Sequence, residues 1–104
     1  MLKDDAIVRQ SSEMIRKDFG LEEEWVFEDS LKPFDRLREL LASHINVLLD
    51  KDFNHLLNVL YRIDIDESIV STLLAGDDVA NDLSEAIIAR EKEKIVTRLR
   101  YRSL

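Results

Sequence analysis

The 104-residue sequence contains no cysteine, one proline (Pro33) and only two glycines, Gly20 and Gly76. Without cysteine, neither a disulfide framework nor a thiolate metal site can form, and nothing points to an oxidising compartment. Folds built from many tight hairpins need residues that readily adopt positive φ, and such residues are scarce here. The composition therefore favours helices over strands.

Long apolar runs are also missing. No stretch approaches the roughly 18 apolar residues that cross a bilayer, and residues 1–5 lack the basic and apolar regions of a signal peptide. We therefore expect a cytoplasmic protein without membrane insertion. The net charge of −7 disfavours general nucleic-acid binding, which depends on Lys and Arg contacts to phosphate. Charge is uneven, because residues 90–104 carry +4 and the remainder −11.

Apolar residues recur at helical spacing along most of the chain. The pattern predicts helices over about 3–19, 33–50 and 53–63, a shorter helix before Gly76, and a last helix that runs into the basic end. Residues 21–29 have no single assignment, because their acidic start suits a helix N-terminus and their aromatic residues suit an extended segment.

Particular residues mark the expected helix ends. Gly20 and Gly76 can adopt the left-handed conformation that ends many helices. Asp52, Asp66 and either Asp77 or Asp78 can cap the helices that follow them; all are aspartates before apolar stripes. The short break at residue 52 predicts an antiparallel hairpin over 34–63 with the last helix packed along it. The expected fold is an all-α bundle of four to five helices in a single domain, residues 1–104.

The two histidines, His44 and His55, are candidates for acid-base or metal chemistry because imidazole titrates near neutrality. Asp52 and His55 could supply two metal ligands, but a site needs three or four, and nothing in the sequence completes the set. A structural or surface role for both histidines is therefore favoured.

A second candidate is the acidic cluster of Asp64, Asp66 and Glu67 near a helix break. The spacing does not match an EF-hand loop, because position six from Asp64 is Ile69 instead of glycine and position twelve is Ala75 instead of glutamate. The favoured interpretation is structural. In it Asp66 caps a helix, Arg62 pairs with one of the carboxylates, and Tyr61 is half-buried.

Two surface segments are candidate partner contacts. Trp25 and Phe27 lie among acidic residues, where large aromatics often cover a small core, although interfaces also favour Trp. Arg98, Arg100 and Tyr101 lie in the basic end, which the fading apolar stripe between residues 90 and 94 predicts to project beyond the core. Cations there also complement the negative end of a helix dipole.

Residues 52–67, which read DFNHLLNVLYRIDIDE, resemble a segment of small helical bacterial proteins to which no activity is assigned. The resemblance covers 16 of the 104 residues and implies a bacterial, cytosolic helical protein. It implies no catalytic or binding role for any position.

The sequence favours a non-enzymatic protein–protein interaction or adaptor module, with a protein partner or a second copy of the chain in contact, because apolar faces are broad and convergent polar groups are few. No catalytic residue, metal ligand or cofactor is assigned. Two alternatives stay open. One is a small metal-dependent or hydrolytic enzyme that uses His44 and His55 or the acidic cluster, and the other is an acidic regulator that mimics nucleic acid.

Overall fold

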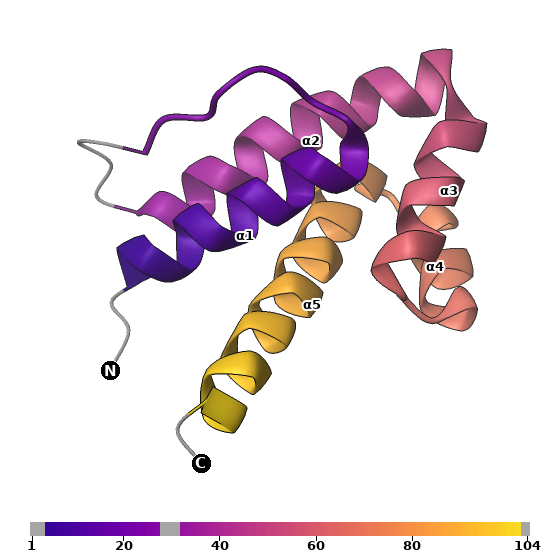
Figure 1. Ribbon diagram of the computed structural model, residues 1–104. Helices are drawn as coiled ribbons and strands as arrows, with labels where there is room; N and C mark the ends of the chain where they lie inside the picture. Colours follow the sequence, from indigo (N-terminus) through magenta and orange to yellow (C-terminus); the bar gives the residue numbers. More distant parts are fainter. Residues whose placement is uncertain (1–3, 28–31, 103–104) are drawn as a thin grey trace.

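The computed structural model describes residues 4–27 and 32–102, and this part of the chain holds five α-helices and no strand (Figure 1). The predicted all-α architecture of four to five helices is confirmed. None of the described helices is long and apolar enough to cross a membrane. The helices are α1 (Asp4–Phe19), α2 (Pro33–Lys51), α3 (Phe53–Ile63), α4 (Glu67–Leu74) and α5 (Val79–Arg102).

Aspartates cap α3 and α4 as the sequence predicts. The Oδ1 atom of Asp52 accepts a hydrogen bond of 3.2 Å from the backbone N–H of His55, at the start of α3. At the start of α4, Oδ1 of Asp66 accepts one of 2.8 Å from the N–H of Ser68. These bonds satisfy donors that have no partner within the first turn of a helix, which confirms both predicted caps.

Two helices end through the same left-handed motif. Gly20, with φ of +71°, follows α1, and the N–H of Leu21 donates to the carbonyl of Arg16 at 2.8 Å. Asp64, with φ of +69°, follows α3 with the equivalent bond from Ile65 to Leu60 at 3.3 Å. Both are Schellman motifs. The stop predicted at Gly20 is therefore confirmed.

The left-handed stop predicted at Gly76 is wrong. Ala75, which follows α4, has right-handed helical dihedrals, and Gly20 is the one glycine in the described part of the chain with positive φ. The N–H of Gly76 donates to the carbonyl of Leu73 at 3.1 Å, so the last turn tightens before the chain leaves the helix.

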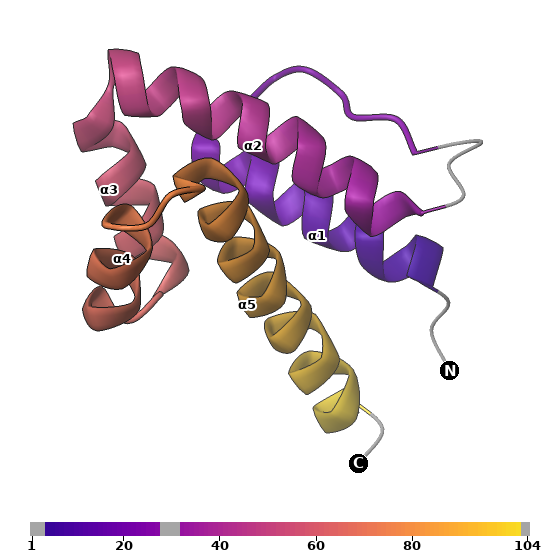
Figure 2. The same ribbon diagram turned by 180° about the vertical axis from the view of Figure 1, so that it is seen from behind.

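The core lies where α5 packs against α1 and α2. Figures 1 and 2 show α5 crossing beneath this pair, while α3 and α4 cover one end. Fully buried side chains from these helices recur at spacings of three and four, as expected for amphipathic helices that share one core. The core comprises Val8, Ile15, Phe19, Leu37, Leu41, Ile45, Leu48, Leu56, Val59, Leu60, Ile63, Ala80, Leu83, Ile87 and Ile88.

The antiparallel hairpin predicted for α2 and α3 is not formed. After α2 the chain turns away, and α3 does not run back along α2 (Figures 1 and 2). The reason is the length of the connection. Asp52 alone joins the two helices, with φ of −154° and ψ of 69°, whereas an antiparallel helical hairpin needs a loop of two to five residues. Consequently α5, not α3, is the main partner of α2.

Candidate functional site

A groove of about 540 Å³ lies between α2 and residues 21–27, the non-helical segment that follows α1 and passes over α2 (Figure 1). Its volume falls within the range of about 300–1,000 Å³ that is typical of ligand pockets. Nine residues line it: Glu23, Glu24, Trp25, Val26, Arg36, Leu40, Ser43, His44 and Val47.

Helix α2 supplies one side of the groove from a single face. Arg36, Leu40, Ser43 and Val47 follow one another at intervals of three or four residues, which places them in one row along the helix. The neighbouring face carries the buried leucines and isoleucine of the core. The buried face of α2 thus contacts the core, while the row in the groove combines the apolar Leu40 and Val47 with two polar residues.

The segment 21–27 supplies the other side. Trp25 is half-buried against the core, and its Nε1–H donates to Oε1 of Glu23 at 3.3 Å. Val26 is the next residue and is 63% exposed, while Val47 on α2 is 55% exposed. Two exposed aliphatic side chains therefore share the groove lining with an indole ring, and Glu23 and Glu24 belong to the same lining.

His44 forms part of the groove wall and contacts the core behind it. Its ring meets that of Phe19 edge to face, with the centroids 5.5 Å apart and an interplanar angle of 81°. Its Nε2 atom is buried and has no hydrogen-bond partner in the described part of the chain. Burial lowers the pKa of His44; the Glu23 carboxylate opposes this shift and His55 adds to it.

His55 also contacts Phe19, through the backbone. Its Nε2 lies 3.2 Å from the Phe19 carbonyl oxygen, one of the carbonyls that have no partner within α1. Both histidines thus stabilise the end of α1. Within residues 4–27 and 32–102, no three His, Asp or Glu side chains lie close enough together to hold a metal ion.

Two of the three carboxylates in the predicted acidic cluster, those of Asp64 and Asp66, have partners within the described chain. Asp64 pairs with Arg90 of α5, and Asp66 caps α4, where hydrogen bonds from the hydroxyl and N–H of Ser68 lower the pKa of the Asp66 carboxyl. The expected pairing of Arg62 with a carboxylate is wrong, because its Nη1 donates to the backbone carbonyl of Asp18 at 3.4 Å.

Tyr61 also differs from the prediction. The side chain was expected to be half-buried, but it is 78% exposed. It precedes Arg62 on the outer face of α3, whereas Leu60 and Ile63 turn into the core.

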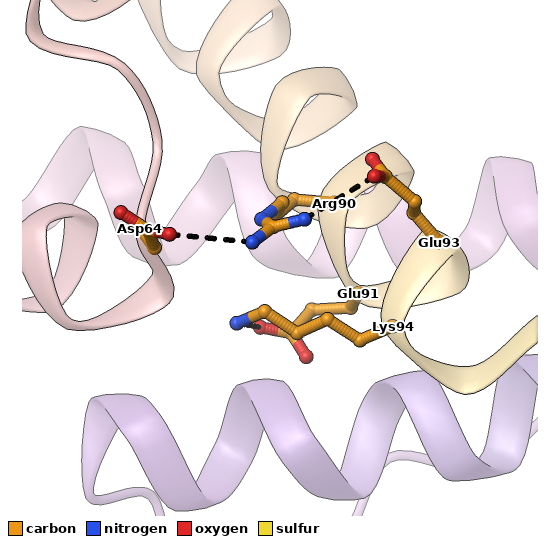
Figure 3. A network of polar contacts seen from close by, with 5 residues as sticks. All are labelled: Asp64, Arg90, Glu91, Glu93 and Lys94. Atoms are coloured by element: carbon orange, nitrogen blue, oxygen red, sulfur yellow. Dashed lines mark hydrogen bonds and ion pairs between the residues drawn. The ribbon is translucent and has the colours of Figure 1, made fainter. Parts of the chain in front are cut away.

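A polar network links α5 to the chain after α3 (Figure 3). Arg90 places Nη2 3.3 Å from Oδ2 of Asp64 and Nη1 3.3 Å from Oε1 of Glu93. The adjacent Glu91 is fully buried, and neither carboxylate oxygen has a hydrogen-bond partner among the described residues. Its closest cation is Lys94, whose Nζ lies 3.6 Å from Oε1.

Burial raises the pKa of Glu91; Lys94 opposes that shift and the Asp18 carboxylate adds to it. The sequence-based interpretation placed no core residue between 90 and 94, so the burial of Glu91 was missed. A signal was present, because Glu91 lies four residues from both Ile87 and Ile95, and these are buried.

The residues predicted as partner contacts fall in two places. Trp25 lines the groove, whereas Phe27 is half-buried against the core and is not part of the lining. Arg98, Arg100 and Tyr101 are exposed at the end of α5, on the opposite side of the molecule from segment 21–27 (Figures 1 and 2). The structure therefore shows two separate surfaces.

Comparison with models of known protein families, with curated proteins and with solved structures gives no match. Val47 and His44 were not among the predicted contacts. The sequence did carry a signal for each residue. Val47 is an apolar residue outside the main apolar stripe of α2, which suggests a second contact. His44 lies one helical turn before the core residue Leu48, which places it beside the buried face.

Proposed function

We propose that the chain is a cytosolic, non-enzymatic protein-interaction module whose contact surface is the groove between α2 and residues 21–27. The observation that carries the proposal is the exposure of Val26 and Val47 beside Trp25 in one concave site. Aliphatic and aromatic side chains around a hollow are typical of the central part of protein interfaces. An adaptor role needs such a surface and no reactive group.

The polar residues of the molecule support this assignment over an enzymatic one. His55 contacts a backbone carbonyl, Asp66 caps a helix, and Asp64 forms an ion pair, so these candidates for chemistry are engaged in structural contacts. His44 also lines the groove. The other titratable groups in the lining are the carboxylates of Glu23 and Glu24 and the guanidinium of Arg36. Ser43 is the one hydroxyl in the lining, and the buried Nε2 of His44 has no hydrogen-bond partner among the described residues, so the groove shows no nucleophile paired with a base.

The test is site-specific photo-crosslinking in the native cell. A photoreactive amino acid replaces Val47 in the groove, and a matched control replaces Ile69, which is 48% exposed on α4. We expect a discrete crosslinked species from position 47 and none from position 69. Val26→Glu introduced together with the probe should abolish the crosslink, because a charge would then face the apolar hollow.

Both positions are well exposed, so folding should be unaffected, and circular dichroism checks this. Equal crosslinking from positions 47 and 69, or none from position 47, would contradict the proposal.

A further inference from the structure

We infer that the groove accepts the end of α5 from a second copy of the chain, in a head-to-tail contact. The inference rests on the proposed function, since it names the occupant of the same groove. It is carried by charge complementarity between two exposed surfaces of one molecule, each of which also carries exposed apolar side chains.

The groove side of the contact is acidic. Glu22, Glu23 and Glu24 are consecutive and exposed, and no Lys or Arg of the described chain lies within ion-pair distance of their carboxylates. The one cation in the lining, Arg36, is paired with Glu39 at 3.5 Å. A positively charged occupant would thus find the carboxylates of Glu23 and Glu24, which form no ion pair within the described chain, in the same lining as the two exposed valines.

The end of α5 has the complementary chemistry. Lys92 lies over the ring of Phe34 at 4.2 Å and Lys94 pairs with Glu91, so these two cations are engaged within the molecule. The remaining cations are Arg98, Arg100 and Arg102, which are exposed and form no ion pair within residues 4–27 and 32–102.

Exposed apolar side chains lie on two different faces of this helix end. Val96 is 37% exposed and lies one turn before Arg100, and Tyr101 is 72% exposed and follows Thr97 at the same spacing. Ile95, on the inner face, is buried. Arg98 lies three residues before Tyr101 and four before Arg102, so one face presents an aromatic ring with two guanidinium groups, a combination that interfaces favour.

A chain cannot fill its own groove in this way, because segment 21–27, which forms one side of the groove, lies on the opposite side of the molecule from the end of α5 (Figures 1 and 2). The contact is therefore between molecules and heterologous, so each copy offers one groove and one helix end. Two turns of helix bury less than the roughly 800 Å² per partner of a standard interface. We accordingly expect weak association that grows with protein concentration.

The test uses two charge-reversed variants of the full chain. In the tail variant, Arg98, Arg100 and Arg102 are each replaced by Glu; in the groove variant, Glu22, Glu23 and Glu24 are each replaced by Lys. We expect sedimentation equilibrium to show self-association of the wild type and monomers for each variant alone. An equimolar mixture of the two should associate again, since each tail then meets a groove of opposite charge.

Salt provides a second measurement on the unmodified chain. Raising the salt from about 0.1 M to about 1 M shortens the Debye length from about 10 Å to about 3 Å. Self-association of the wild type should weaken by at least about tenfold. Tyr101→Ala, which keeps every charge, should also weaken it.

A wild type that stays monomeric at high concentration in low salt would overturn the inference. So would a mixture of the two variants that does not associate although both are folded by circular dichroism. If the wild type is monomeric while the Val47 crosslink contains a different protein, the inference fails and the proposed function stands. If neither association nor crosslink is found, both fail.

Discussion

Arg90 of α5 forms an ion pair with Asp64, the residue that follows α3, with its Nη2 3.3 Å from Oδ2 of Asp64. Asp64 has φ of +69°, a conformation that non-glycine residues rarely adopt and that aspartate and asparagine tolerate best. The aspartate side chain is 85% exposed, so the ion pair itself contributes little. The left-handed backbone is therefore the stronger constraint at this position.

Asp64→Ala should lower the free energy of unfolding by about 1–2 kcal/mol, because alanine is disfavoured in the left-handed conformation and loses the ion pair. Asp64→Asn and Asp64→Gly should lie within about 0.5 kcal/mol of the wild type, since both residues accept this backbone. Urea denaturation followed by circular dichroism measures all three. Arg90→Gln removes the ion pairs of Arg90 with both Asp64 and Glu93, so its effect sets an upper limit on what the Asp64 pair contributes. Equal losses for Ala and Asn would show that the backbone is not the constraint.

Glu91→Gln should stabilise the protein at neutral pH. Burial raises the pKa of Glu91 above its ordinary value of 4.5, so the folded protein binds this proton more tightly than the unfolded chain. The free energy of unfolding therefore falls as pH rises from about 4.5 through the raised pKa, and stays lower above it. Glutamine removes the buried charge, so we expect a higher free energy of unfolding at pH 7 than in the wild type.

The gain from Glu91→Gln should shrink toward pH 4, where the carboxyl of the wild type is protonated. Glu93→Gln, at an exposed position on the same helix, is the matched control and should change stability little at either pH. Denaturation midpoints of the wild type and both variants at the two pH values measure these differences. A gain that is the same at both pH values would mean that the buried charge is not its cause.

The helices and two of their caps could be predicted because the relevant signals are local. Asp52 and Asp66 each precede an apolar stripe, and their side chains reach backbone donors two or three residues on. The left-handed conformation of Asp64 after α3 could not be assigned from the residue type alone, because an aspartate next to a helix can also act as a helix cap or as an ion-pair partner. The direction of α3 relative to α2 was not predicted correctly. The backbone conformation of the single connecting residue, Asp52, sets this direction, and the apolar periodicity of the two helices carries no information about it.

The candidate site was predicted only in part, because it depends on contacts between distant segments. Trp25 was identified from its residue type, but nothing local shows that residues 21–27 pass over α2 and leave Val47 exposed beside it. Glu91 reads as a surface residue from its charge. Its burial follows from the packing of α5 against α1, a tertiary contact that overrides the usual preference of glutamate for solvent.

Gly20→Ala should destabilise the protein by about 1 kcal/mol through its backbone alone. The φ of Gly20 is +71°, and a Cβ built there would meet no atom within 4 Å, so the cost is conformational and not steric. Gly76→Ala is the matched control, because Gly76 lacks the left-handed conformation and its Cβ would lie 3.3 Å from the carbonyl oxygen of Leu73. Denaturant unfolding should show the larger loss for Gly20→Ala, and the reverse order would contradict this account.

His44 should act on stability in the direction opposite to Glu91. Burial lowers the pKa of His44 below its ordinary value of 6.5, so the unfolded chain binds the proton more tightly than the folded protein does. The free energy of unfolding therefore falls as pH drops from about 6.5 through the lowered pKa. His44→Leu keeps an apolar contact with Phe19 and removes the titrating ring, so its loss of stability between pH 7 and pH 5 should be smaller than that of the wild type.

The opposing contributions of His44 and Glu91 can be separated with a double variant. In the Glu91→Gln background the contribution of the buried carboxyl is absent, so a chain that retains His44 should lose stability more steeply between pH 7 and pH 5 than the wild type does. Adding His44→Leu to that background should flatten the profile again. Urea midpoints of the two single variants and the double variant measure both effects. Parallel pH profiles for the wild type and the His44→Leu variant would show that the imidazole keeps the same pKa in the folded and unfolded chains.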